Sequence, residues 1–142
     1  MDVAAAAGER AARLLPGLGF PADTTAGGAI AIESDAAASH RWFVPAVRGD
    51  DLLGFLVFDG DVLLRSSSFP SPVPAGDWLD AERIRERAER FSGDRAVGEP
   101  VLSHDGAPDH HLAWRVPMPS GFVFVAGTAA WWSRPRPDQV TG

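Results

Sequence analysis

The sequence predicts an α+β protein in which a helix followed by an antiparallel meander occurs twice. Three observations predict this class: two segments with helical apolar spacing, short strand-like runs separated by turn residues, and a repeated pair of motifs. With 142 residues, 45% of them apolar and 23% charged, the chain has the length and composition of a single globular domain. We therefore expect one domain over residues 1–142, with its helices packed on antiparallel sheet.

The first helix is expected from Asp2 to about residue 15. Asp2 can cap its start, and the alanines at 4–7 have the highest helix propensity. Pro16 and Gly19 are expected to end the helix, since proline and glycine are typical of helix termini.

Four strand-like segments follow in the first half. They are apolar or β-branched, and Gly and Asp residues between them favour tight turns. The segments are 28–33, 40–47, 52–58 and 62–66. The next stretch, 66–76, contains Pro70, Pro72 and Pro74, which do not fit a sheet interior, so we expect an extended connector there.

The second helix has the clearest local pattern. Apolar residues recur at helical spacing from Ala81 to Phe91, Asp77 is expected to cap the start, and Gly93 is expected to end it. Glu and Arg occupy most other positions, which we interpret as a solvated face. The strands expected after this helix are 97–104, 110–116 and 121–132, and the tail 133–142 is expected to be flexible.

A pair of motifs occurs in both halves, which span about residues 1–70 and 76–132. Residues 42–45 and 114–117 both read W-x-V-P, and G-F-x-x-x-x-G follows each of them, at 54–60 and 121–127. Helix precedes strands in both halves. We interpret the repetition as duplication of one module, with chance similarity of short motifs as the alternative.

The second half resembles the PepSY-like modules of the cystatin-like folds. Residues 80–84, 88–93, 101–102, 111–116 and 122–125 carry the similarity. With the first half as another copy, the resemblance covers nearly the whole chain as a tandem. It implies a helix wrapped by a curled antiparallel meander, and some family members restrain peptidases. It supplies no catalytic residues.

Composition excludes several kinds of chemistry. There is no Cys, so disulfides and thiolate metal sites are excluded, and all 13 basic residues are Arg, so a lysine Schiff base is excluded. A net charge of -6 disfavours nucleic acid and acidic membranes as partners. The composition is typical of a high-GC bacterium. With no basic leader or long apolar segment, we expect a cytoplasmic protein with no cofactor.

A cluster of histidines and aspartates at 103–111 could in principle bind a metal. The weak candidates are His104, Asp105 and His110. Because adjacent His110 and His111 point to opposite faces of a strand, a polar hairpin tip is the better interpretation, and we expect no metal site.

The catalytic residues, if any, are unknown. His40, with Ser39 and Asp35 nearby, has the residue types of a hydrolytic triad but none of the usual motif context.

The candidate ligand-binding residues are aromatic or cationic side chains on predicted strands. Trp42 and Trp114 occupy matching repeat positions, so we assign them to packing. Flat rings suit partner or ligand contacts, and arginine suits carboxylates. The candidates are Trp131, Trp132, Arg41 and Arg115.

The sequence favours a non-catalytic, regulatory module that binds a protein or peptide through an exposed sheet face or edge. Edge strands also make a homo-oligomer feasible. The alternative is a small enzyme or small-molecule binder that uses His and Asp groups in a pocket between helix and sheet.

Overall fold

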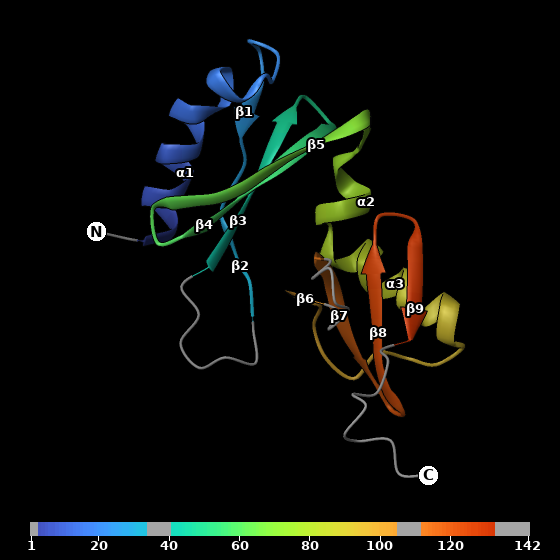
Figure 1. Cartoon of the computed structure of the whole chain (residues 1–142). Coiled ribbons are helices and arrows are strands. Elements are labelled where there is room, and N and C mark those ends of the chain that lie inside the picture. The colour runs from blue at the N-terminus through green and yellow to red at the C-terminus, as the bar shows by residue number, and fades with distance from the viewer. Residues whose placement is uncertain (1–2, 34–40, 105–111, 133–142) are drawn as a thin grey trace. The chain divides into compact units, whose positions relative to one another are not determined.

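The computed structural model describes residues 3–33, 41–104 and 112–132. Its fold is α+β, with two antiparallel sheets and a few helices (Figure 1). The chain divides into two compact units, which we call unit 1 (residues 1–78) and unit 2 (residues 79–142). The predicted α+β class with antiparallel sheet is confirmed.

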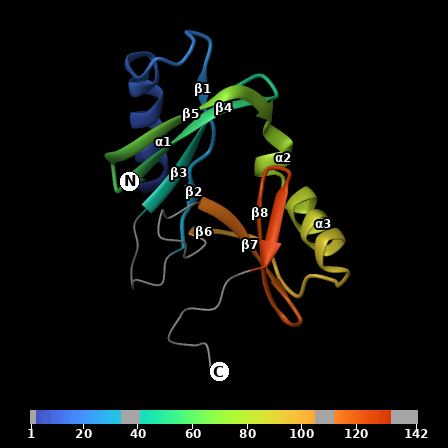
Figure 2. The same ribbon diagram turned by 45° about the vertical axis from the view of Figure 1, so that its right-hand side comes forward.

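Unit 1 begins with a helix and continues as a five-stranded sheet whose paired strands are all antiparallel. The strand order is β1-β3-β4-β5, and β2 also pairs with β3. The helix α1 lies alongside this sheet in both views (Figures 1 and 2). The elements are α1 (Val3–Leu14), the 3-10 helix η1 (Leu15–Leu18), β1 (Thr25–Ala26), β2 (Ile30–Ala31), β3 (Arg41–Arg48), β4 (Asp51–Asp59), β5 (Val62–Pro74) and α2 (Ala75–Leu79).

The end of the first helical segment follows the predicted stop signals. Pro16 lies in the first turn of η1, and Gly19 follows η1 with a φ of 88°. The N–H of Gly19 donates a hydrogen bond to the carbonyl oxygen of Pro16. A side chain at this left-handed position would be strained, which explains the glycine.

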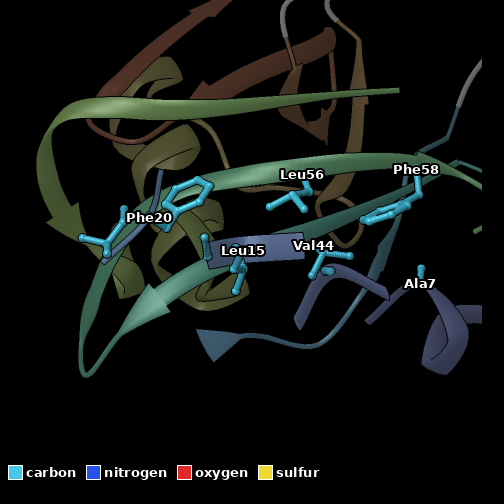
Figure 3. Close-up of a cluster of buried hydrophobic side chains, with 9 residues drawn as sticks. Ala7, Leu15, Phe20, Val44, Leu56 and Phe58 are labelled. Carbon is cyan, nitrogen blue, oxygen red and sulfur yellow. The ribbon is translucent and has the colours of Figure 1, made fainter. Parts of the chain in front are cut away.

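One cluster of buried apolar side chains joins α1 to the sheet of unit 1 (Figure 3). Successive residues of a strand point to opposite faces, so alternate residues of β3 and β4 face the helix. Val44 pairs with Leu56 across the strands, and both are fully buried. Trp42 packs at the margin and is partly buried. The buried members are Ala7, Ala11, Leu15, Phe20, Val44, Ala46, Leu53, Leu56 and Phe58.

The described part of unit 2 consists of one helix and a four-stranded antiparallel sheet in the order β6-β7-β8-β9. The helix packs on β7, β8 and β9, with Ile84 and Ala88 buried in the contact (Figure 1). Trp114 is also buried. The elements are α3 (Ala81–Ser92), β6 (Val101–His104), β7 (Leu112–Met118), β8 (Gly121–Ala126) and β9 (Ala129–Trp132).

A single arginine links α3 to the turn between β8 and β9. The Nη1 atom of Arg87 donates a hydrogen bond to the carbonyl oxygen of Gly127. This contact spans a long stretch of chain, so no local sequence pattern could indicate it.

The helix α3 begins after Asp80, not after Asp77. The Asp80 carboxylate accepts hydrogen bonds from the N–H groups of Glu82 at 3.0 Å and Arg83 at 3.5 Å. Asp77 lies within the short helix α2 instead. The predicted cap at Asp77 is therefore wrong, because both aspartates carry the same cap signal and the backbone turns to an extended conformation at Asp80.

Replacing the cap is expected to weaken unit 2. Asp80→Ala leaves two N–H groups at the start of α3 without their acceptor, and should lower the free energy of unfolding by about 1 kcal/mol. Urea denaturation monitored by circular dichroism measures the change in the free energy of unfolding. Asp80→Asn retains an acceptor and should keep most of the stability. An equal loss in both variants would contradict the cap.

Much of the segment expected to be a connector, 66–76, is strand. Residues 66–68 pair with β4, and after a register shift Val73 and Pro74 pair with it again. Because β5 is an edge strand, only one side of its backbone belongs to the ladder. The prolines exclude a sheet interior, as expected, but they do not exclude this edge.

The orientation of Pro74 on β5 follows from one hydrogen bond. The N–H of Ala75 donates to the carbonyl oxygen of Asp50 at 2.8 Å, which is the side of β4. Backbone groups alternate between the two sides along a strand. The nitrogen of Pro74, which pairs with Asp51, therefore faces the free edge, where it replaces an N–H donor.

Three other strand boundaries differ from expectation. The segment 28–33 contributes only β2, and β1 precedes it. The strand expected at 97–104 begins only at Val101. The strand expected at 121–132 is divided by a turn at Gly127, whose φ is 59°, so that it forms the hairpin of β8 and β9.

Candidate functional site

The two faces of the unit 2 sheet differ in what covers them. The ring centroids of Trp132 and Phe91 of α3 are 6.2 Å apart, so α3 covers the face that carries Trp132. Side chains alternate between faces along β9, which places Trp131 on the other face. Phe124 pairs with Trp131 and shares that face. In the described part of unit 2, no helix packs on it.

Four side chains gather on this second face, which we call the aromatic face: Arg115, Phe122, Phe124 and Trp131. The rings of Phe124 and Trp131 stack with centroids 6.1 Å apart and an interplanar angle of 24°. The Arg115 guanidinium carbon lies 5.0 Å from the centroid of the Phe122 ring, a cation–π contact. Phe122 is 41% exposed, whereas Phe124 is buried. The face therefore combines a stacked pair of rings, of which Phe124 is buried, with the exposed ring of Phe122.

Two of the four candidate ligand-binding residues, Trp131 and Arg115, meet on the aromatic face. They flank Phe124, since Arg115 and Trp131 pair with it from opposite sides. Trp132 lies on the α3 side and is 41% exposed. Arg41 is an exposed residue at the start of β3 in unit 1.

Sequence reasoning missed Phe122 as a member of this cluster. Its only sequence signal is its place in the G-F motif, which by itself indicates a strand start. The contact with Arg115 depends on the register of β7 and β8, in which Pro117 pairs with Phe122. Long-range register of this kind is not encoded in local spacing.

Unit 1 holds a second aromatic cluster, also not expected from the sequence. Phe43 and Phe55 face away from α1, because their neighbours Val44 and Leu56 face toward it. Phe43 stacks on Phe55 at 5.0 Å and nearly parallel to the Trp78 ring of α2 at 6.4 Å. The α2 ring therefore packs on this face of unit 1, and Phe69 completes the cluster at 6.2 Å from Trp78.

A polar groove of about 550 Å³ lies beside the end of α3. Its charges are partly satisfied within the groove: Arg85 Nη1 is 3.2 Å from Glu99 Oε1, and Glu89 accepts a hydrogen bond from the N–H of Ala96 at 2.9 Å. The lining contains no histidine or aspartate, the groups that the alternative function requires. The lining residues are Arg85, Glu89, Arg95, Ala96, Gly98 and Glu99.

Several candidate residues lie outside the described part of the chain. These are Asp35, Ser39, His40, Asp105 and His110, and of His104 only the backbone is described, at the end of β6. Within residues 3–33, 41–104 and 112–132, no group of three or more His, Asp or Glu side chains is arranged to hold a metal ion. Over the same ranges, no helix combines the length and apolar character needed to span a bilayer.

Comparison of the chain with protein-family models, with curated proteins and with solved structures finds no match.

Proposed function

We propose that the protein is a non-catalytic, regulatory module that binds a protein or peptide through the aromatic face of unit 2. The observation that carries the proposal is the 41% exposure of Phe122 beside Arg115 and Trp131, on a face to which the described part of unit 2 brings no helix. Aromatic and arginine side chains dominate the binding energy of protein interfaces. A cytoplasmic location is part of this proposal.

The geometry favours a binding role because the cluster is held by strands. Arg115 and Phe122 come from the neighbouring strands β7 and β8. Trp131 stacks on the ring of Phe124, which is buried. Side chains that are already ordered lose little conformational entropy on binding. Arginine suits such an interface by its chemistry, because a planar guanidinium group stacks on aromatic rings and recognises carboxylates.

We also propose that units 1 and 2 are copies of one module. The support is the strand register at the repeated motifs, which is the same in both units. Pro45 pairs with Phe55 as Pro117 pairs with Phe122. Three further pairs of unit 1 have counterparts in unit 2. The pair Trp42–Phe58 corresponds to Trp114–Val125, Val44–Leu56 to Val116–Val123, and Ala46–Gly54 to Met118–Gly121.

The motif prolines support the same proposal. The carbonyl oxygen of Pro45 accepts a hydrogen bond from the N–H of Gly27 at 2.8 Å, and that of Pro117 accepts one from Val97 at 2.8 Å. A Cβ at Gly27 would lie 2.7 Å from Pro45 Cγ, and one at Gly98 would lie 2.9 Å from Pro117 Cγ. Each motif proline therefore packs against a glycine. The tandem PepSY-like resemblance belongs to this proposal, because each unit places a helix before its meander.

Replacing Phe122 with a photo-crosslinking phenylalanine derivative tests the binding function. Ultraviolet irradiation in a lysate of the source organism should link position 122 to a discrete protein. The same probe at Val97, which is 66% exposed in unit 2, should not. With that protein purified, Phe122→Ser should weaken binding at least about tenfold, because an exposed aromatic anchor is lost.

Val97→Ser serves as the matched control and should change the affinity by less than about twofold, as expected for a contact outside the interface. Equal cross-linking from both positions, or equal affinity of the two serine variants, would contradict the proposed face. A small metabolite that raises the unfolding temperature only while Phe122 is present would instead favour the small-molecule function.

A further inference from the structure

The strand β9 is an edge strand that lacks the usual protection against pairing. Among the described residues it is the last strand of the unit 2 sheet and pairs only with β8, in a regular register (Figure 1). Its residues, Ala129–Trp132, carry no charge and include no proline. Natural edges are commonly protected by charges, prolines or bulges. The free side of β9 therefore retains its backbone donors and acceptors.

The turn before β9 determines which of these backbone groups face the free edge. A two-residue loop joins β8 to β9, and its first residue, Gly127, has the positive φ of 59° that a type II′ turn requires. The residues on either side of such a loop, Ala126 and Ala129, exchange both of their backbone hydrogen bonds. Because backbone groups alternate along a strand, the N–H and C=O groups of Ala130 and Trp132 point to the free edge.

This alternation matches the edge to a second copy of itself. A two-fold axis perpendicular to the sheet keeps every side chain on its own face, so residues that meet must lie on the same face. With Trp131 opposite Trp131 of the second copy, Ala130 meets Trp132 of that copy, and Trp132 meets its Ala130. Each of these two pairs carries outward backbone groups and can exchange two hydrogen bonds. Within 129–132, a register centred on Ala130 would form only one such pair.

The side chains at this edge also suit a second copy. On the α3 side, the small Ala130 lies opposite Trp132 of the second copy, which leaves room for the indole ring. Trp132 is 41% exposed and the neighbouring Phe91 is 46% exposed, so both rings have apolar surface to bury. On the other side, the two Trp131 rings meet as an aromatic cross-strand pair, a favourable combination. Each of them also stacks on its own Phe124.

The helices do not obstruct this arrangement. The helix α3 packs on β7, β8 and β9, so its axis runs near β8, the middle strand of the three. From β8 of one copy to β8 of the other there are three strand spacings, or about 14 Å. Packed helices need only about 8–10 Å between their axes, so the two α3 helices would not collide. The rings of Phe91 and Trp132 would fill part of the space between them.

We propose that the protein forms a two-fold symmetric homodimer in which the β9 strands of two copies pair antiparallel, with Trp131 opposite Trp131. The dimer joins the two unit 2 sheets into one continuous sheet. The inference goes beyond the proposed function and does not depend on a partner at Phe122. The paired segment is short and buries less than the roughly 1,200 Å² of a stable interface, so we expect a dissociation constant between about 10 µM and about 1 mM.

Sedimentation equilibrium of the full chain tests the dimer with two variants of one residue. Ala130→Pro removes an outward N–H group from each copy, and an edge strand tolerates proline when its nitrogen faces solvent. The dissociation constant should rise at least about tenfold, because hydrogen bonds are lost and their acceptors stay unpaired. Ala130→Ser keeps the N–H group and should change the constant by less than about threefold. Circular dichroism checks that both variants are folded.

Cysteine cross-linking tests the register. The chain has no cysteine, so a single introduced thiol can link only to its counterpart in a second copy. Trp131→Cys places the two thiols at a pair whose Cα atoms lie about 4.5 Å apart, within disulfide range. With oxidised glutathione as the oxidant, this variant should give a covalent dimer. Ala129→Cys is also an exposed residue of the edge, but its two copies lie more than about 13 Å apart and should not link.

The proposal is overturned by any of three results. The first is a chain that remains monomeric at about 1 mM. The second is an equal dissociation constant for the folded Ala130→Pro and Ala130→Ser variants. The third is cross-linking at position 129 that is as fast as at position 131, and this comparison decides if Ala130→Pro fails to fold. Loss of the dimer would leave cross-linking of a partner from position 122 unchanged, so the two proposals fail separately.

Discussion

Gly54→Ala is expected to lower the free energy of unfolding by about 2–4 kcal/mol, because the added methyl group has no space. A Cβ at this position would overlap the carbonyl oxygen of Ser67 and lie 2.9 Å from the Cα of Ser68 on β5. It would also lie 3.0 Å from the ring of Phe20. Two of these neighbours are backbone atoms of the paired strand, so the ladder between β4 and β5 must shift.

The measurement is urea denaturation together with hydrogen exchange of the β4 amides. Gly8→Ala is the matched control, because Gly8 lies within α1 and nothing approaches its Cβ position within 4 Å. That variant should stabilise the helix by about 0.5–1 kcal/mol, as alanine replaces glycine in a helix interior. Equal stability changes in the two variants would show that Gly54 is not in close contact with β5.

Phe58→Ala is expected to destabilise the protein by about 3–5 kcal/mol. Phe58 has no exposed surface and belongs to the buried cluster beneath α1. It pairs with Trp42 on one side and Leu63 on the other, so its removal leaves a cavity that strands on both sides would have to close. The loss combines the transfer free energy of the ring with the cost of that cavity.

Denaturant titration measures this loss against Phe122→Ala. Phe122 is 41% exposed, so the same change there should cost less than about 1 kcal/mol. If both phenylalanine variants unfold at the same urea concentration, Phe58 is not the core residue that the structure shows.

The helix at 81–92 and the hairpin strands could be predicted from the sequence because their signals are local. Apolar spacing and the Gly93 stop define the helix, and Gly60 with a φ of 61° makes the turn between β4 and β5. The first residue of α3 could not be predicted, because Asp77 and Asp80 are equivalent as caps until the path of α2 is known.

The candidate site could be predicted only in part. Alternation along β9 correctly separates Trp131 from Trp132, but it does not indicate which face the helix covers. The contact of Arg115 with Phe122 depends on strand register, and the stacking of Trp78 on Phe43 depends on the position of α2. Both are long-range relations, which a sequence pattern does not contain.

Both ends of β5 are poorly suited to template another extended chain. Pro74 has no N–H to offer at the C-terminal end of the free edge. Near the N-terminal end, the register shift beside Leu64 interrupts the regular spacing of the backbone groups. These two irregularities disfavour the open-ended stacking of strands that leads to aggregation.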